Sequence, residues 1–166
     1  MSPRRLIRLL LAFSLLLFPL TPDRTTARAA WRWPLAAPVT VLHGFDPPAQ
    51  RWLPGHLGVD LAAEPGDEVY AAGPGRVHFV GPVAGTPLVS VAHGDLRTTY
   101  LPVESALARG EPVEAGQVIG TLAAGPTHCA DRPCLHWGLL EGATHLDPLS
   151  LLGRGEVRLL PLGAPL

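Results

Sequence analysis

From about residue 39 onward, glycine or proline interrupts the chain every eight to twelve residues, and short runs of strand-forming residues lie between these breaks. The runs are rich in valine, leucine, threonine and aromatic residues, which suit a pleated, half-buried surface. They read EVYAA, RVHFVG, LVSVAH, LRTTYLPV, QVIGTLA and CLHWGLL. Such spacing is typical of an antiparallel sandwich or barrel. We therefore expect an all-β fold.

Residues 1–29 are predicted to be a secretory signal peptide. Three arginines precede an apolar run from Leu9 to Leu20, and Ala27 and Ala29 supply small residues at the −3 and −1 positions of a cleavage site. The run is about twelve residues, whereas a membrane-spanning helix needs roughly 20. We expect a secreted protein with no membrane segment in its mature form, and an uncleaved anchor is the alternative.

Cleavage after Ala29 leaves enough chain for one modest hydrophobic core. We divide it into an N-terminal strap and entry strand (30–54), one domain (55–153) and a C-terminal tail (154–166). The formal charge changes from −1 for the whole chain, with 13 basic and 14 acidic side chains, to −5, with 8 and 13. A mildly acidic domain without a basic cluster argues against a nucleic-acid partner.

The segment GHLGVDLAA places His56 and Asp60 four residues apart. In a straight strand they would lie about 13 Å apart at ~3.3 Å per residue, which is too far to share one ion. A turn must therefore intervene, and Gly55 and Gly58 permit one at low steric cost. Folded back in this way, an imidazole and a carboxylate are both ligands that zinc accepts. The alternative is a hydrogen-bonded surface pair.

Four motifs, in order, make the chain resemble the lysostaphin-type metallopeptidases, metallopeptidase family 23, over about residues 55–140. They are HLGVDLAAEPGDEVYAAGPGRVHFVG, LVSVAHGDLRTTYLPV, GEPVEAGQVIGTL and CLHWGLL. The resemblance implies a compact antiparallel β-sandwich or barrel-sandwich hybrid with one zinc ion in a groove. It also implies hydrolysis of peptide bonds in cell-wall peptidoglycan. By position, the implied ligands are His56 and Asp60 from the family's H-x-x-x-D, and His136 as the second histidine of its H-x-H.

Three protein ligands would leave the fourth zinc position open for water, whose pKa the ion can lower to about 7. The resemblance also implies two further histidines, which accept a proton and steady the reaction intermediate. Cys134 and Pro102 stand at those two positions. Loss of a general acid or base typically costs 10² to 10⁴ in rate. We name His128 and the hydroxyl of Tyr100 as candidate catalytic substitutes.

The two cysteines, Cys129 and Cys134, have two alternative interpretations. As a free thiolate, Cys134 would be a fourth zinc ligand, which would close the site and abolish hydrolysis. As a Cys129–Cys134 disulfide, the pair would pin the loop CADRPC. Export favours the disulfide.

We predict a secreted zinc metalloendopeptidase that acts on peptidoglycan peptides and is associated with the cell wall. The alternative is a catalytically inactive homologue that keeps zinc and binds peptidoglycan or activates a separate wall hydrolase. Biotinyl and lipoyl carriers share the β architecture, but they attach their cofactor to lysine. The chain contains no lysine, so that class is excluded.

Overall fold

The computed structural model describes residues 31–153 apart from 51, 126–127 and 130–131. The predicted signal peptide and the C-terminal tail lie outside these residues. Almost all regular structure in the described part is antiparallel β-sheet, so the predicted all-β fold is confirmed. The helical structure there is one short 3₁₀ turn, and within the described residues no helix has the length and apolar content to span a membrane.

The described residues form eleven strands. In chain order they are β1 (Val41–His43), β2 (Val59–Ala62), β3 (Glu68–Tyr70), β4 (Gly75–Val83), β5 (Thr86–His93), β6 (Leu96–Leu101), β7 (Val103–Glu104), β8 (Pro112–Val113), β9 (Val118–Leu122), β10 (Cys134–Glu141) and β11 (Thr144–Leu146), followed by the 3₁₀ turn η1 (Pro148–Leu152).

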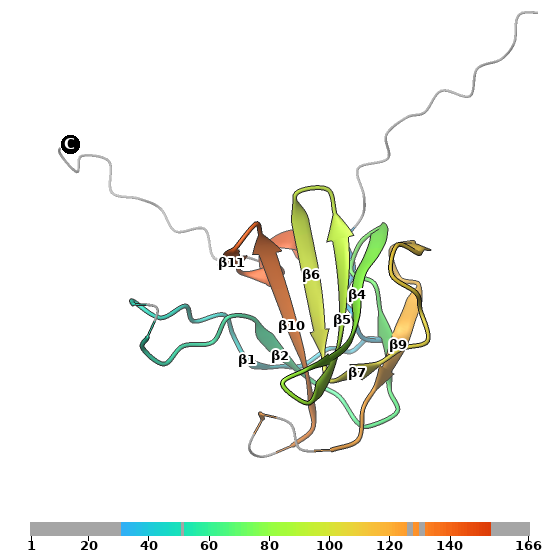
Figure 1. Ribbon diagram of the computed structural model, residues 1–166. Helices are drawn as coiled ribbons and strands as arrows, with labels where there is room; N and C mark the ends of the chain where they lie inside the picture. The colour runs from blue at the N-terminus through green and yellow to red at the C-terminus, as the bar shows by residue number, and fades with distance from the viewer. Residues whose placement is uncertain (1–30, 51, 126–127, 130–131, 154–166) are drawn as a thin grey trace, which may run out of the picture.

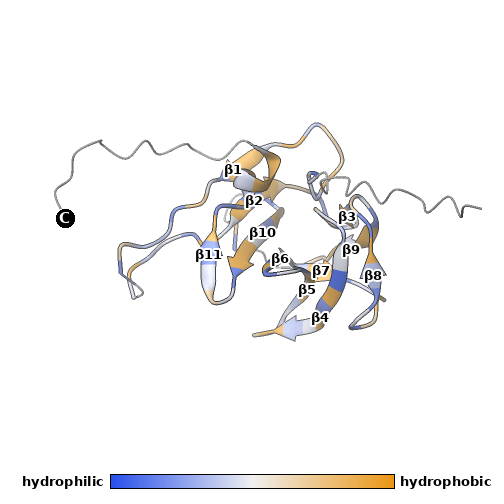
Figure 2. Cartoon of the chain, turned by 90° about the horizontal axis from the view of Figure 1, so that it is seen from above, coloured by the Kyte–Doolittle hydropathy of each residue, from blue (hydrophilic) through white to orange (hydrophobic). Residues whose placement is uncertain are grey.

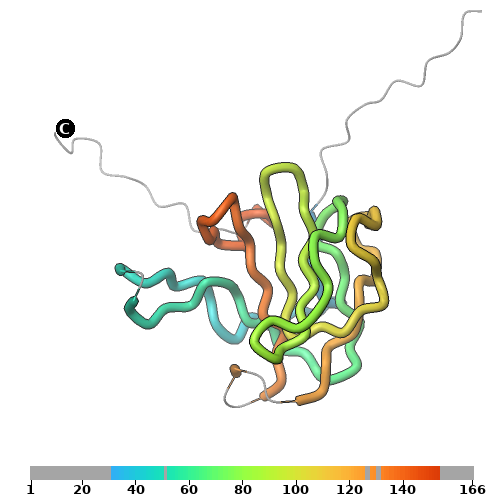
Figure 3. The backbone as a smooth tube through the Cα atoms, in the orientation of Figure 1, coloured from blue at the N-terminus to red at the C-terminus, as the bar shows by residue number. Residues whose placement is uncertain are grey.

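Two antiparallel sheets share one core. The larger has the order β1-β2-β10-β6-β5-β4-β8, with β11 added beside β10, and the smaller has the order β3-β9-β7. Figure 1 shows β10, β6, β5 and β4 side by side as the long central strands. From above, the strands of both sheets surround a common centre (Figure 2). The backbone tube in Figure 3 follows β10 alongside β2 and β6.

Strand β10 separates the core from the face that carries the candidate site. Side chains alternate between the two faces of a strand. Leu135, Trp137 and Leu139 are at most 1% exposed and pack in the core. His136 lies between them and faces the other way, where its side chain is 19% exposed. The core therefore fixes the strand from which His136 projects.

The strap that precedes β1 is attached to the domain through its backbone and its tryptophans. The Arg32 amide donates to the Ala72 carbonyl at 2.8 Å. The Trp31 ring packs edge-on against His93, with ring centroids 4.9 Å apart. The Nδ1 atom of His93 lies 2.8 Å from the Pro74 carbonyl, and burial lowers the pKa of this histidine. These contacts hold the strap against the domain.

Candidate metal centre

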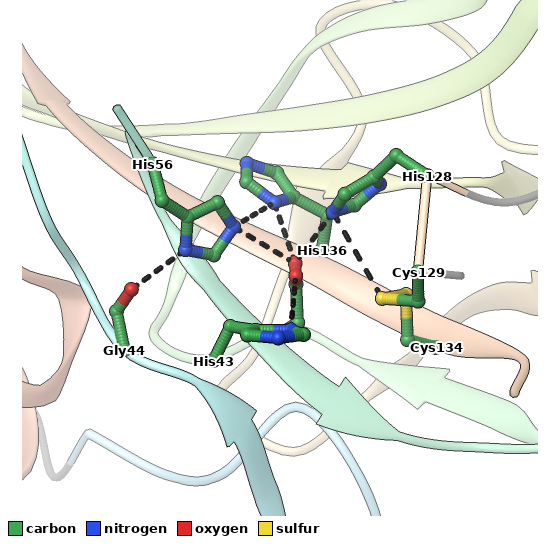
Figure 4. A network of polar contacts seen from close by, with 8 residues as sticks. His43, Gly44, His56, His128, Cys129, Cys134 and His136 are labelled. Carbon is green, nitrogen blue, oxygen red and sulfur yellow. Dashed lines mark hydrogen bonds and ion pairs between the residues drawn. A yellow bond between two sulfur atoms is a disulfide. The ribbon is translucent and has the colours of Figure 1, made fainter. Parts of the chain in front are cut away.

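Four side chains from separate segments converge on the face of the larger sheet that is opposite the core, over β2 and β10 (Figure 4). They are His56, Asp60, His128 and His136, and one ligand atom of each lies within 4.8 Å of the others. Asp60 on β2 and His136 on β10 are directly paired in the strand register. The three residues predicted to bind zinc therefore lie together, and so does the histidine proposed as a catalytic substitute.

A bend brings His56 back onto Asp60. His56 forms an isolated bridge with Asp46, the next two residues are bent, and β2 begins at Val59. The His56 Nε2 atom lies 3.0 Å from Asp60 Oδ1. Gly58, inside the bend, has a steric role because a Cβ there would lie 2.6 Å from His136 Nε2. The H-x-x-x-D spacing therefore works through the predicted turn, and one of its glycines makes room for the second histidine.

One carboxylate oxygen is the centre of the cluster. Asp60 Oδ1 lies 2.8 Å from both His136 Nδ1 and His128 Nε2, in addition to its contact with His56. Burial by itself raises the pKa of Asp60, which is 2% exposed, but the hydrogen bond from His136 and the electrostatic interaction with His128 outweigh it. Their combined effect lowers this pKa to about 2. Asp60 is therefore a carboxylate at neutral pH.

The contacts of His56 identify which of its nitrogens carries the proton. Nδ1 lies 2.6 Å from the Gly44 carbonyl oxygen, which can only accept a hydrogen bond, so Nδ1 is the donor. In a neutral imidazole the other nitrogen, Nε2, then carries a lone pair. That lone pair faces Asp60 Oδ1, which is also an acceptor. The contact is favourable only with a cation between the two atoms or with a second proton on the ring.

The donor set fits a divalent metal such as zinc. Imidazole nitrogen and carboxylate oxygen both bind zinc at ~2.0 to 2.2 Å. Donors at such distances around a tetrahedral ion would be roughly 3.3 Å apart. His56 Nε2 and His136 Nδ1 are 3.2 Å apart. A backbone carbonyl that holds the remaining N–H of a histidine, as Gly44 does for His56, is a regular feature of metal-binding histidines.

Sequence reasoning missed His43, which the structure places on the other side of the carboxylate. His43 is paired with Asp60 across β1 and β2, and its Nδ1 lies 3.4 Å from Asp60 Oδ2. The side chain is 66% exposed. No local motif marks this histidine. Only the strand register brings it to the site.

The hypothesis that Tyr100 donates to a reacting group is wrong. Tyr100 is fully buried, and it is paired in register with the core residue Trp137, so it lies on the opposite face of the sheet from the site. Its oxygen accepts hydrogen bonds from the Ala72 amide and the Thr98 hydroxyl, both at 2.9 Å. Burial raises the pKa of Tyr100 to about 12. It is a core residue.

Cys129 and Cys134 are joined in a disulfide. Neither sulfur is therefore a thiolate available to close the metal site. Of the two interpretations of Cys134, the structure contains the disulfide and not the zinc ligand. Pro102 lines the pocket beside His136 and has no proton to exchange. Of the substitutes considered, His128 is the one that reaches the site.

Two adjoining pockets lie over the cluster, with volumes of about 330 and 430 Å³. They share Leu57, Leu101 and His136, so the candidate centre lies where they meet. The larger pocket is lined by equal numbers of apolar and polar side chains, and the polar ones include His145 and Arg97. Burial, followed by the positive charges of His136 and Arg97, lowers the pKa of His145. Together the two pockets provide a groove that runs over the cluster and extends beyond His136.

Comparison with known proteins identifies the family. The model of peptidase family M23 matches residues 54–148. The chain belongs to peptidase family M23. This M23 chain is 50% identical over 137 residues to an uncharacterised protein of Mycobacterium tuberculosis, in an alignment that covers 80% of this chain and 55% of the relative. It spans about half the length of the curated relatives it matches.

Solved structures show the same M23 fold. A zinc-containing peptidase from Vibrio cholerae is 27% identical, with a TM-score of 0.60 over 75% of this chain and 40% of that one. The antimicrobial peptidase lysostaphin from Staphylococcus simulans is 24% identical, with a TM-score of 0.60 over 77% of this chain and 56% of that one. The second likeness shows the fold alone. The predicted family is thus confirmed.

Proposed function

We propose that this chain is an exported, zinc-dependent endopeptidase that hydrolyses peptide bonds in peptidoglycan. Membership of family M23 supports the general class. The observation that carries the zinc assignment is the convergence of three ligand atoms: His56 Nε2, Asp60 Oδ1 and His136 Nδ1 lie between 2.8 and 3.2 Å from one another. A cation held by His56, Asp60 and His136 accounts for this spacing.

Zinc bound there would supply Lewis-acid polarisation of the scissile carbonyl and activation of water. The chain itself supplies the charge, the orientation and the proton acceptor. Asp60 contributes the negative charge, and Gly44 orients His56. His128, whose side chain is 50% exposed and open to the groove, takes up the proton released during hydrolysis. The substrate peptide lies in the two pockets that meet at His136.

The disulfide supports the proposed location. Disulfides persist in exported proteins and are rare in the reducing cytosol. A bond between Cys129 and Cys134 therefore agrees with the signal peptide predicted at residues 1–29 and with action at the cell wall.

Pro102 and Cys134 favour a second candidate function. Neither position offers an imidazole, and each replaces a histidine that the family resemblance implies. A protein that holds zinc, binds peptidoglycan and activates a separate wall hydrolase accounts for these substitutions without hydrolysis.

Digestion of purified peptidoglycan separates the two functions. The unaltered protein is incubated with peptidoglycan, with and without a chelator, and the soluble products are identified by mass. We expect metal-dependent release of peptides that carry new termini, which a His56→Ala variant does not produce. Co-sedimentation with peptidoglycan but no new termini would support the binding function instead.

A further inference from the structure

His128 reaches the site in a different way from the other three residues of the cluster. Asp60 and His136 project from paired strands, and His56 is fixed by its bridge to Asp46. His128 comes from the loop that precedes β10. Its polar contacts given by the structure are with Asp60 Oδ1 and with a sulfur of its neighbour Cys129, at 2.8 and 3.9 Å.

The covalent anchor of this loop lies on the same strand as His136. Cys134 begins β10, two residues before His136, so the two side chains project from the same face of the sheet. The register pairs Cys134 with Ala62 and His136 with Asp60, which places the disulfide next to the cluster. Figure 4 shows the sulfur atoms beside the His128 ring.

The anchored imidazole packs against the others. The His128 ring centroid lies 5.0 Å from that of His136, in an edge-to-face arrangement, and 6.0 Å from that of His56. Cys134 also occupies the position at which the family resemblance places the first histidine of H-x-H. Cys134, which replaces this histidine, is thus bonded to Cys129, the residue next to His128.

We infer that the Cys129–Cys134 disulfide is a positioning device, which holds His128 against Asp60 as a substitute for the histidine that Cys134 replaces. The inference rests on the proposed function for its catalytic meaning, but the positioning itself is independent of activity. A single hydrogen bond to a half-exposed ring opposes the conformational entropy of the loop weakly. The disulfide ties Cys129, the next residue in the chain, to the start of β10, so the hydrogen bond is not the sole restraint on His128.

Proton NMR tests the positioning directly. In the unaltered protein, we expect cross-relaxation between the ring protons of His128 and His136, and between those of His56 and His136, whose centroids are also 5.0 Å apart. In a Cys129→Ala/Cys134→Val variant, the cross-peak between His128 and His136 should be lost. The cross-peak between His56 and His136 should remain and serves as the internal control. Retention of the His128 cross-peak at unchanged intensity in the folded variant would overturn the inference.

Reduction of the unaltered protein provides a second measurement in case the variant does not fold. Dithiothreitol supplies two electrons and two protons, leaves two thiols on the protein and becomes its own cyclic disulfide. The His128 cross-peak should disappear on reduction and return on reoxidation. A cross-peak that persists in the fully reduced, folded protein would contradict the positioning role.

A rescue experiment tests the substitution. His128→Ala should reduce peptidoglycan hydrolysis by about 10² to 10⁴. A Cys129→Ala/Cys134→His/His128→Ala variant restores a histidine at position 134. We expect it to hydrolyse peptidoglycan at least ten times faster than the His128→Ala variant. No recovery in a folded triple variant would refute the substitution. If the unaltered protein does not hydrolyse peptidoglycan, the proposed function fails while the NMR result still decides the positioning.

Discussion

A methyl group at Gly58 should disable the metal centre while leaving all four clustered side chains in the sequence. A Cβ at this position would lie 2.6 Å from His136 Nε2 and 2.7 Å from the Trp137 carbonyl oxygen. Ordinary contact begins at 3.4 Å, so either β10 or the His136 ring must move by about 0.8 Å. Metal–ligand distances tolerate only about 0.2 Å. We expect Gly58→Ala to weaken zinc binding by at least about 10- to 100-fold, the range measured when ligand-orienting contacts are lost.

The assay is competition for zinc against a chromophoric chelator, with thermal unfolding as a check on folding. Overpacking of this kind costs about 1–3 kcal/mol, which a stable domain can tolerate. Gly44→Ala is the matched control: a Cβ there meets no atom within 4 Å, and the carbonyl that contacts His56 is retained. If folded Gly58→Ala binds zinc as tightly as Gly44→Ala, the reasoning about His136 is refuted.

Three further outcomes are expected. The pKa of Tyr100 is raised to about 12 from an ordinary value of 10.0, so the stability that its protonated form contributes is complete below pH 10 and is lost as the pH rises through 12. Tyrosinate absorbance should therefore show Tyr100 ionising only as the protein unfolds, and ionisation well before unfolding would disprove this. Leu61→Ala, at a fully buried position, should lower the free energy of unfolding by about 2–5 kcal/mol, whereas Leu53→Ala, at an exposed position, should lower it by less than about 0.5 kcal/mol. Equal losses in denaturant unfolding would contradict the core assignment. His43→Ala should change zinc affinity by less than about threefold, because the His43 side chain is largely exposed and contacts Asp60 Oδ2 rather than Oδ1. A loss of affinity as large as that of His56→Ala would make His43 a ligand.

Local patterns were enough to predict β3, β4, β5, β6, β9 and β10 and the bend between His56 and Asp60, but not β2, which carries Asp60, nor β8 and β11. Short apolar runs separated by glycine and proline favour antiparallel pairing, and the two glycines near His56 permitted the turn that distance required. These inferences depend only on neighbours in the chain. The strand register, which depends on the whole sheet, decided the rest of the site.

Tyr100 and His43 show this limit: Tyr100 was predicted at the site and is not there, and His43 was not predicted there and is. Tyr100 stands next to groove residues in the sequence, but alternation along β6 turns it toward Trp137 in the core. His43 is thirteen residues before His56 and carries no motif, yet pairing of β1 with β2 places it at Asp60. Neither outcome follows from local sequence, because each requires knowing which strands are neighbours and which residues face each other.

The cysteines lie between these cases. Composition and the expected export predicted that Cys129 and Cys134 would pair, and the structure contains that bond. What the pairing does for His128 became visible only with the loop and β10 in place, because the sequence separates His128 from Asp60 by 68 residues.

The central claim is that His56, Asp60 and His136 hold one zinc ion. The most direct test is the metal content of the purified protein after dialysis, measured beside alanine variants of these three residues. The account predicts about one zinc per chain in the unaltered protein and none in the folded variants. Absence of zinc from the folded, unaltered protein in zinc-containing buffer would contradict it.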